Sequence, residues 1–220
     1  MKYMDIYNQI LQNKEKQFGV LVDPEQCDKK VLSELISLAS ESAVDFILIG
    51  GSLLINDHTD ECIKLIKSET GLPVILFPGS EMQLNPGADA ILLLSLISGR
   101  NPELLIGKHV AAAPYLKSSG LEIIPTGYML IESGNATTAL YMSNTNPIPR
   151  KKDDIAVCTA MAGEMLGLKM IYMDAGSGAS QAIPPSMISK VKAQLSIPLI
   201  VGGGISDPEI ARQSCNAGAD

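Results

Sequence analysis

The chain has 220 residues, of which 17 are basic and 24 are acidic, and its formal net charge is -7. A chain of this length can form one large α/β domain with a full core, so we expect a single domain over residues 1–220. The acidic balance argues against general binding of nucleic acid, which needs a basic face. No run reaches the roughly 18 apolar residues of a transmembrane helix, and the charged first residues do not form a signal peptide.

Seven short apolar runs recur at nearly even spacing and predict buried strands. They cover residues 18–22, 46–49, 73–77, 90–94, 121–124, 170–173 and 198–201. Helical patterns lie between them, over residues 29–42, 60–70, 153–166, 185–195 and 207–215, the last opened by a capping box at Ser206-Asp-Pro-Glu209. This alternation predicts an α/β fold of the (β/α)8 TIM-barrel type, with function in the loops after the strands. Because only seven strands are found, we expect the sequence to be a fragment that stops before strand eight.

The third crossover is unusually short. Residues 79–87 read GSEMQLNPG, which is too rich in turn residues for an ordinary helix with its two loops. We therefore expect the third crossover helix to be missing or degenerate. Such a gap would expose an apolar flank of the barrel, and either a long hydrocarbon substrate or a second subunit would cover it.

The strongest candidate site follows the sixth predicted strand, where Tyr172 and Asp174 lead into the glycine-rich turn of residues 175–178. Residues two apart point to the same side of a strand, so the tyrosine and the carboxylate should lie together. Glycines let the backbone approach a phosphate, and successive amides can form an anion-binding nest. The glycines of residues 202–204 repeat this design after the seventh strand. Together the two loops predict binding of a phosphorylated polyol.

Two further candidates end the first and second predicted strands. Asp23 is either a ligand for a phosphate-bound metal or a turn-forming residue. Gly50-Gly-Ser52 either approaches a ligand or forms an ordinary turn. The polar loop of residues 135–152 ends in Pro149-Arg-Lys-Lys152 and either covers the site, supplies cations to a diphosphate or is simply solvated.

The four cysteines, Cys27, Cys62, Cys158 and Cys215, have no metal-binding spacing, and we expect reduced core thiols in a cytoplasmic protein.

As a set, these motifs resemble the geranylgeranylglyceryl phosphate synthase family, whose barrels lack a regular third helix and bind the prenyl chain in the resulting groove. The motifs are Leu21-Val-Asp-Pro-Glu25, Gly50-Gly-Ser52, Tyr172-Met-Asp-Ala-Gly-Ser-Gly178 and Gly202-Gly-Gly204. The resemblance implies a Mg²⁺-dependent prenyltransferase of lipid biosynthesis that joins sn-glycerol 1-phosphate to geranylgeranyl diphosphate. It also implies contact with the membrane surface for the lipid substrate, and we expect a homo-oligomer.

The resemblance also assigns roles to single residues. Asp23 and Ser52 would hold the metal, and Asp174 and Tyr172 would be the catalytic residues. Glycerol phosphate would contact Tyr172, Asp174, Ala175, Gly176, Ser177, Gly178, Gly203 and Gly204. Many members of the family carry glutamate where this chain has Asp174.

Three alternatives stay open at this point. A relative that uses a longer prenyl diphosphate, of the heptaprenylglyceryl phosphate synthase type, would share these motifs. A sugar-phosphate isomerase or cyclase could use similar glycine loops on the same barrel. A non-catalytic lipid-binding or assembly protein is the third alternative.

Overall fold

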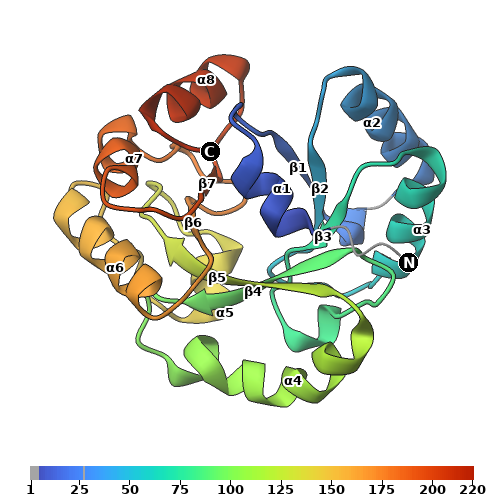
Figure 1. Ribbon diagram of the computed structural model, residues 1–220, viewed down its shortest axis with the longest axis horizontal. Coiled ribbons are helices and arrows are strands. Elements are labelled where there is room, and N and C mark those ends of the chain that lie inside the picture. Colours follow the sequence, from blue (N-terminus) through green and yellow to red (C-terminus); the bar gives the residue numbers. More distant parts are fainter. Residues whose placement is uncertain (1–4, 27) are drawn as a thin grey trace. The chain divides into compact units, whose positions relative to one another are not determined.

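The computed structural model describes residues 5–26 and 28–220, and all seven predicted strands are found in this described part. They follow one another in the sheet in sequence order (Figure 1). The pairs β1–β2, β2–β3, β3–β4, β5–β6 and β6–β7 are parallel, which confirms an α/β fold with a TIM-like parallel sheet. The strands are β1 Gly19–Val22, β2 Phe46–Ile49, β3 Val74–Leu76, β4 Ala90–Leu96, β5 Glu122–Leu130, β6 Met170–Asp174 and β7 Leu199–Gly202.

Five predicted helices are confirmed with shifts of a few residues at their ends. They are α2 Lys29–Glu41, α3 Thr59–Glu69, α6 Asp153–Met165, α7 Pro185–Lys192 and α8 Pro208–Ala217. The predicted capping box of α8 is wrong in one detail, because Asp207 is the N-cap and accepts a hydrogen bond from the Ile210 N–H at 3.0 Å.

The structure also contains helices that the apolar pattern does not predict. They are α1 Ile6–Gln12, α4 Lys108–Ser119, α5 Thr138–Ser143 and a π-helical turn over Glu103–Gly107. In α4, Pro114 lies inside the helix and only Ala112 and Leu116 are buried, so its sequence has no apolar stripe.

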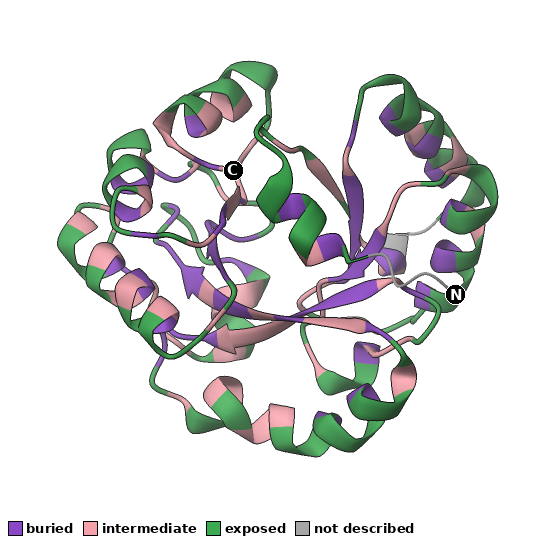
Figure 2. Cartoon of the chain, in the orientation of Figure 1, coloured by how far each residue is buried: buried purple, intermediate pink, exposed green. Residues whose placement is uncertain are grey.

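The chain forms two compact units. The first includes residues 17–93 and 108–124, and α2 packs beside α3 in it. The second includes residues 94–107 and 125–220, with α7 packed between α6 and α8 (Figure 1). In both units the strands are largely buried, and the helices turn exposed faces outward (Figure 2).

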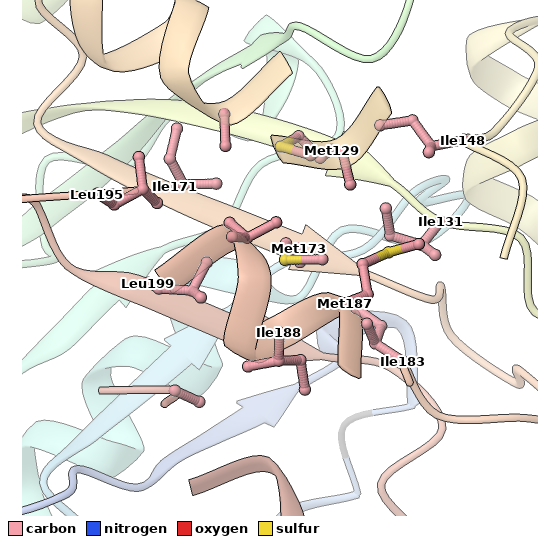
Figure 3. Packing of buried hydrophobic residues seen from close by; sticks show 14 of the residues in the cluster. Met129, Ile131, Ile148, Ile171, Met173, Ile183, Met187, Ile188, Leu195 and Leu199 are labelled. Carbon is pink, nitrogen blue, oxygen red and sulfur yellow. The ribbon is translucent and has the colours of Figure 1, made fainter. Parts of the chain in front are cut away.

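Each unit has its own apolar core. Side chains of β2, β3, α2 and α3 fill the first, including Ile36, Ile47, Ile63 and Leu76. Side chains of β5, β6, β7 and α7 fill the second, where Met129, Met173, Met187 and Leu199 are fully buried (Figure 3). Truncating a buried side chain of this size to alanine costs roughly 2–5 kcal/mol in unfolding free energy, so these cores stabilise the strands that carry the candidate site.

The third crossover has no regular helix, as predicted. Between β3 and β4 the chain forms only a single 3-10 turn, η2 Glu81–Gln83. Helix α4 packs against this turn, and the Lys108 ammonium lies 3.4 Å from the Glu81 carboxylate. The strand residues on either side, Ile75 and Ile91, are nevertheless buried. The flank is therefore less exposed than the sequence alone suggests.

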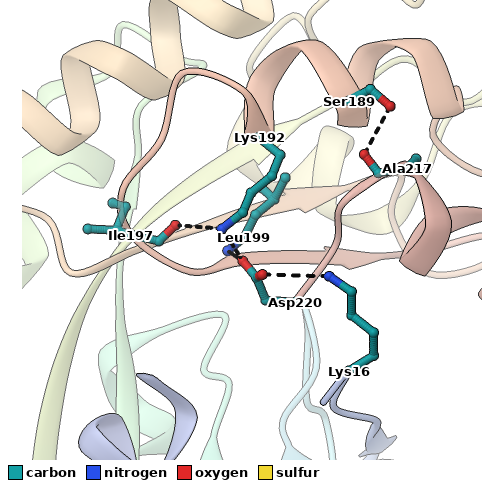
Figure 4. A network of polar contacts seen from close by, with 7 residues as sticks. All are labelled: Lys16, Ser189, Lys192, Ile197, Leu199, Ala217 and Asp220. Carbon is teal, nitrogen blue, oxygen red and sulfur yellow. Dashed lines mark hydrogen bonds and ion pairs between the residues drawn. The ribbon is translucent and has the colours of Figure 1, made fainter. Parts of the chain in front are cut away.

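A polar network holds the N-terminal end of β7 (Figure 4). Asp220 accepts a hydrogen bond from the Leu199 N–H at 2.8 Å, and its own N–H donates to the Leu199 carbonyl at 2.9 Å. The Lys192 ammonium donates to the same carboxylate at 2.6 Å, and Lys16 lies 3.8 Å away. These contacts fix the strand whose other end leads into the glycines of residues 202–204.

The expectation of four reduced core thiols is wrong. Cys62 is fully buried but disulfide-bonded, whereas Cys158 is a free, exposed thiol and Cys215 is free and half-buried. Cys27 lies outside the described residues. As for membrane insertion, none of the described helices combines the length and the apolar character needed to cross a bilayer.

Candidate active site

The second unit brings Asp174 and two tyrosines together. Asp174, the last residue of β6, is only 7% exposed. Its Oδ2 accepts a hydrogen bond from the Tyr128 hydroxyl at 2.5 Å, and its Oδ1 accepts one from the Gly176 N–H at 2.7 Å. Tyr128 of β5 pairs in register with Tyr172 of β6, and their ring centroids are 5.9 Å apart. The two strands thus place a carboxylate beside two phenols in a nearly dry setting.

Burial dominates the acid–base properties of this group. It raises the pKa of Asp174 above the ordinary aspartate value, while the hydrogen bonds from Tyr128 and Gly176 lower it. Burial and the nearby Asp174 charge also raise the pKa of Tyr128 and of Tyr172, so both phenols stay neutral. A carboxylate with a raised pKa that is held by neutral donors can take up a proton, which is the property of a general base.

Tyr128 is the site residue that the sequence pattern misses. The predicted fifth strand ends at residue 124, just before Pro125, whereas β5 continues to Leu130. A signal was nevertheless present. The apolar run of residues 127–131 contains a lone tyrosine, and a phenol among buried residues usually needs a hydrogen-bond partner.

The glycine loops after β6 and β7 lie against each other. A side chain at Gly203 would place its Cβ 2.6 Å from Asp174 Oδ1 and 2.6 Å from the Gly176 nitrogen, and Gly203 has a φ of 77°. Only glycine fits this position, for reasons of both space and backbone conformation. The close approach of the two loops supports the prediction that they act as one site.

The backbone amides of these loops divide into two groups. The Ala175 N–H donates to the Gly202 carbonyl at 3.0 Å, and the Gly176 N–H donates to Asp174. These two amides therefore hold the site together. Within the described chain, the amides of Ser177, Gly178, Gly203 and Gly204 make no hydrogen bond. Four amides without protein partners on two adjoining glycine loops are suited to the oxygens of a phosphate.

The first unit holds the other two predicted site residues near each other. Asp23 Oδ1 accepts a hydrogen bond from the Glu25 N–H at 3.1 Å, so the turn-forming role is real. The same oxygen would lie 3.2 Å from a Cβ built on Gly51, which places the Asp23 carboxylate beside the loop that carries Ser52. Gly50 lies close to the protein's own backbone, because a Cβ at this position would lie 2.0 Å from the Phe77 carbonyl oxygen. The close approach that this glycine permits is therefore to the neighbouring strand end and not to a ligand.

The 3-10 turn of the third crossover supports this loop. The buried Gln83 donates from Nε2 to the Gly51 carbonyl at 2.9 Å and accepts from the Gly79 N–H at 2.9 Å. One side chain therefore ties the loop after β2 to the loop after β3. Gln83 has no sequence signature, since a glutamine in a turn gives no pattern.

The residues present are compatible with a weakly held Mg²⁺. No group of three or more His, Cys, Asp or Glu side chains in the described part of the chain is arranged to hold a metal ion. Mg²⁺, however, is usually bound by one or two carboxylates together with substrate phosphates. Asp23 Oδ2 makes no hydrogen bond within the described residues, so it could serve as such a ligand. The Asp23 carboxylate therefore fits a metal that arrives with substrate phosphates.

A TIM-like sheet with a buried carboxylate and glycine loops after its strands defines a class of α/β proteins that place their chemistry at the carboxyl ends of parallel strands. Within this class, the chain belongs to the PcrB family, whose model matches residues 8–220. The resemblance found in the sequence is thereby confirmed.

Three similar proteins give this family its context. A geranylgeranylglyceryl phosphate synthase of Chitinophaga pinensis is 55% identical over 218 residues, which are 98% of this chain and 86% of that protein. The structure of wild-type GGGPS from Thermoplasma volcanium matches with a TM-score of 0.92 at 37% identity, covering 99% of this chain and 88% of its own. The Thermoplasma acidophilum (S)-3-O-geranylgeranylglyceryl phosphate synthase, solved in complex with its substrate sn-glycerol-1-phosphate, matches with a TM-score of 0.92 at 34% identity, with the same coverage.

Proposed function

We propose that this protein is a prenyltransferase that joins sn-glycerol 1-phosphate to geranylgeranyl diphosphate and releases diphosphate, in ether-lipid biosynthesis. The observation that carries the proposal is the contact between the Asp174 carboxylate and the two glycine loops. It occurs in a chain that is 55% identical to a protein named for this reaction. A phosphate on the loops would leave the glycerol hydroxyls close to a buried base.

In the proposed reaction the glycerol hydroxyl oxygen attacks C1 of the prenyl diphosphate. The new C–O ether bond forms as the bond between C1 and the diphosphate oxygen breaks, and the electron pair leaves with diphosphate. Asp174 accepts the hydroxyl proton. Tyr128 holds the carboxylate, and the amides of Ser177, Gly178, Gly203 and Gly204 bind the phosphate. Tyr172 packs against the start of the loop of residues 202–204, because a Cβ on Gly202 would lie 2.4 Å from its hydroxyl oxygen. From this position the tyrosine contacts the glycerol.

Asp23 and Ser52 are proposed to hold Mg²⁺ together with oxygens of the diphosphate. When bound, the metal would neutralise charge on the leaving diphosphate. The protein's own part is to keep Asp23 in place through its hydrogen bond to the Glu25 N–H and through contact with Gly51.

We further propose that residues 1–220 form one α/β domain, in a homo-oligomeric, cytoplasmic protein that contacts the membrane surface when it takes up lipid. The loops after β2 and β3 would contribute to the prenyl site. They carry the exposed apolar side chains Leu53, Ile55 and Met82, and Gln83 ties these loops together. Exposed apolar groups on adjoining loops suit a hydrocarbon chain.

Met82→Lys should weaken binding of the prenyl substrate selectively. Met82 is 86% exposed, so the charge should cost the fold little, but it would remove an apolar contact worth roughly 0.8 kcal/mol per buried methylene. We expect the KM for the prenyl diphosphate to rise several-fold while the KM for glycerol phosphate stays unchanged. Met165→Lys is the matched control, because Met165 is 79% exposed at the end of α6. Equal losses for both substrates would instead indicate a subunit interface or misfolding.

The pH dependence of turnover should report the ionisation of Asp174. A general base must be ionised, so turnover should fall as the pH drops through the pKa of Asp174, which burial raises. Tyr128→Phe removes a hydrogen bond that lowers this pKa. We therefore expect the acid limb of the kcat profile to move to higher pH in the variant. A limb that stays in place, or moves to lower pH, would show that this carboxylate does not control the profile.

Turnover with labelled sn-glycerol 1-phosphate and a panel of prenyl diphosphates tests the proposal. The expected product is geranylgeranylglyceryl phosphate, formed with release of one diphosphate. A preference for a longer prenyl chain would favour the heptaprenylglyceryl phosphate synthase type. Conversion of a sugar phosphate without any prenyl substrate would favour an isomerase or cyclase. Binding of the lipid without a product would indicate a non-catalytic protein.

A further inference from the structure

The segment that follows β5 is hydrogen-bonded to the glycine loop that follows β6. Asn135 donates from Nδ2 to the Gly178 carbonyl at 3.1 Å and accepts at Oδ1 from the Ser180 N–H at 2.9 Å. The Ser180 hydroxyl donates to the Ser133 carbonyl at 2.7 Å. Three hydrogen bonds therefore join residues 133–135 to residues 178–180, more than 40 positions apart in sequence.

Close packing supports these hydrogen bonds. Gly134 has a φ of 87°, and a Cβ there would lie 2.8 Å from the Ser180 hydroxyl oxygen. Thr137 is 6% exposed, and its hydroxyl oxygen would lie 2.6 Å from a Cβ on Gly176. The same threonine caps α5 by accepting from the Leu140 N–H at 3.3 Å. At Gly134 and Gly176 the two segments therefore leave no room for an added side chain.

We propose that Asn135 is a positioning residue that holds the loop of residues 176–180 in its phosphate-binding conformation. The inference rests on the proposed function, because it assigns the loop to the phosphate of glycerol phosphate. The loop contains Gly176 and Gly178, both with positive φ, so without the hydrogen bonds from Asn135 it would have many accessible conformations. A loop ordered before binding does not lose that freedom when the ligand arrives, which raises affinity.

The chemistry of asparagine suits this role. Its side-chain amide carries a donor and an acceptor at one end, so one group can satisfy the Gly178 carbonyl and the Ser180 N–H together. Alanine would lose both hydrogen bonds. Aspartate would keep the acceptor for Ser180 but could not donate to Gly178, and it would add negative charge near an anion. Asn135 does not contact Asp174 through any of these bonds. Its hydrogen bonds should therefore affect the affinity for glycerol phosphate and not the proton transfer.

The test compares steady-state kinetics of the wild-type protein, Asn135→Ala and Asn135→Asp. We expect Asn135→Ala to raise the KM for glycerol phosphate about tenfold, the effect of two lost hydrogen bonds. The kcat and the KM for the prenyl diphosphate should stay within about twofold. Asn135→Asp should raise the KM for glycerol phosphate at least as much. Ser143→Ala is the matched control, because the Ser143 hydroxyl donates to the Leu140 carbonyl in the same segment and does not touch the loop.

Hydrogen exchange supplies a readout that does not depend on activity. Without ligand, the hydrogen-bonded amides of Gly176 and Ala179 should exchange faster in Asn135→Ala than in the wild type, and added glycerol phosphate should restore protection. An unchanged KM in an active enzyme would overturn the inference, even if exchange rises. Parallel loss of kcat, thermal stability and affinity would overturn it too, because the role would then be general folding support. A wild-type protein that does not turn over glycerol phosphate would overturn the proposed function itself, and the inference with it.

Discussion

Asp174→Asn should lower kcat by about 10²-fold to 10⁴-fold, the usual range for loss of a general base. The substitution keeps the size of the side chain but removes the charge that would accept the glycerol proton. One amide oxygen can still accept from Tyr128 or Gly176, although the amide NH₂ would then face the other donor. Steady-state turnover at saturating concentrations of both substrates measures the effect, and a thermal melt checks that the variant folds.

Asp174→Glu separates a catalytic role from a structural one. Glutamate keeps the carboxylate and adds one methylene, so the variant should retain substantial activity if the carboxylate is what matters. The structural role is a real alternative, since Asp174 Oδ1 also closes a turn with the Gly176 N–H. If Asp174→Asn were as active as the wild type while Asp174→Glu were inactive, Asp174 would be a turn element and the assignment of the base would be wrong.

Asp23→Asn should abolish most Mg²⁺-dependent turnover and leave the fold intact. An asparagine oxygen can still accept the Glu25 N–H, so the turn should survive, but the ligand charge for a metal-bound diphosphate is lost. The activity should be titrated with Mg²⁺, and we expect the variant to need much more metal, with a large deficit at limiting Mg²⁺.

Asp28→Asn is the matched control for this experiment. Asp28 caps α2 by accepting from the Lys30 and Val31 N–H groups, and asparagine caps a helix about as well. This control should behave like the wild type at every Mg²⁺ concentration. Turnover by Asp23→Asn close to that of the wild type at limiting Mg²⁺ would refute the metal role, and Asp23 would then be only the turn-forming residue.

Strong local signals made most of the fold predictable. Buried parallel strands are continuous apolar runs, so β2 at Phe46–Ile49 is found to the residue. The signal fails where the backbone departs from its usual chemistry. Pro125 suggests the end of a strand, yet its carbonyl accepts the Lys169 N–H at 2.8 Å and β5 continues beyond it. Because the predicted strand stops before this proline, Tyr128 falls outside it.

The sequence pattern indicated candidate site residues but not their contacts. The order tyrosine, aspartate, glycine turn pointed to Tyr172 and Asp174, because spacing by two fixes their side of the strand. Which amides remain for a phosphate depends on register between β6 and β7, since Ala175 donates to Gly202. The hydrogen bonds from Asn135 to Gly178 and Ser180 join segments far apart in sequence, and no local pattern encodes such a pairing.

The most direct test of the account is a crystal structure of the wild-type protein with sn-glycerol 1-phosphate. We expect phosphate oxygens within hydrogen-bond distance of the amides of Ser177, Gly178, Gly203 and Gly204, and a glycerol hydroxyl within hydrogen-bond distance of Asp174. A phosphate bound away from both glycine loops, or a glycerol that points its hydroxyls away from Asp174, would contradict it.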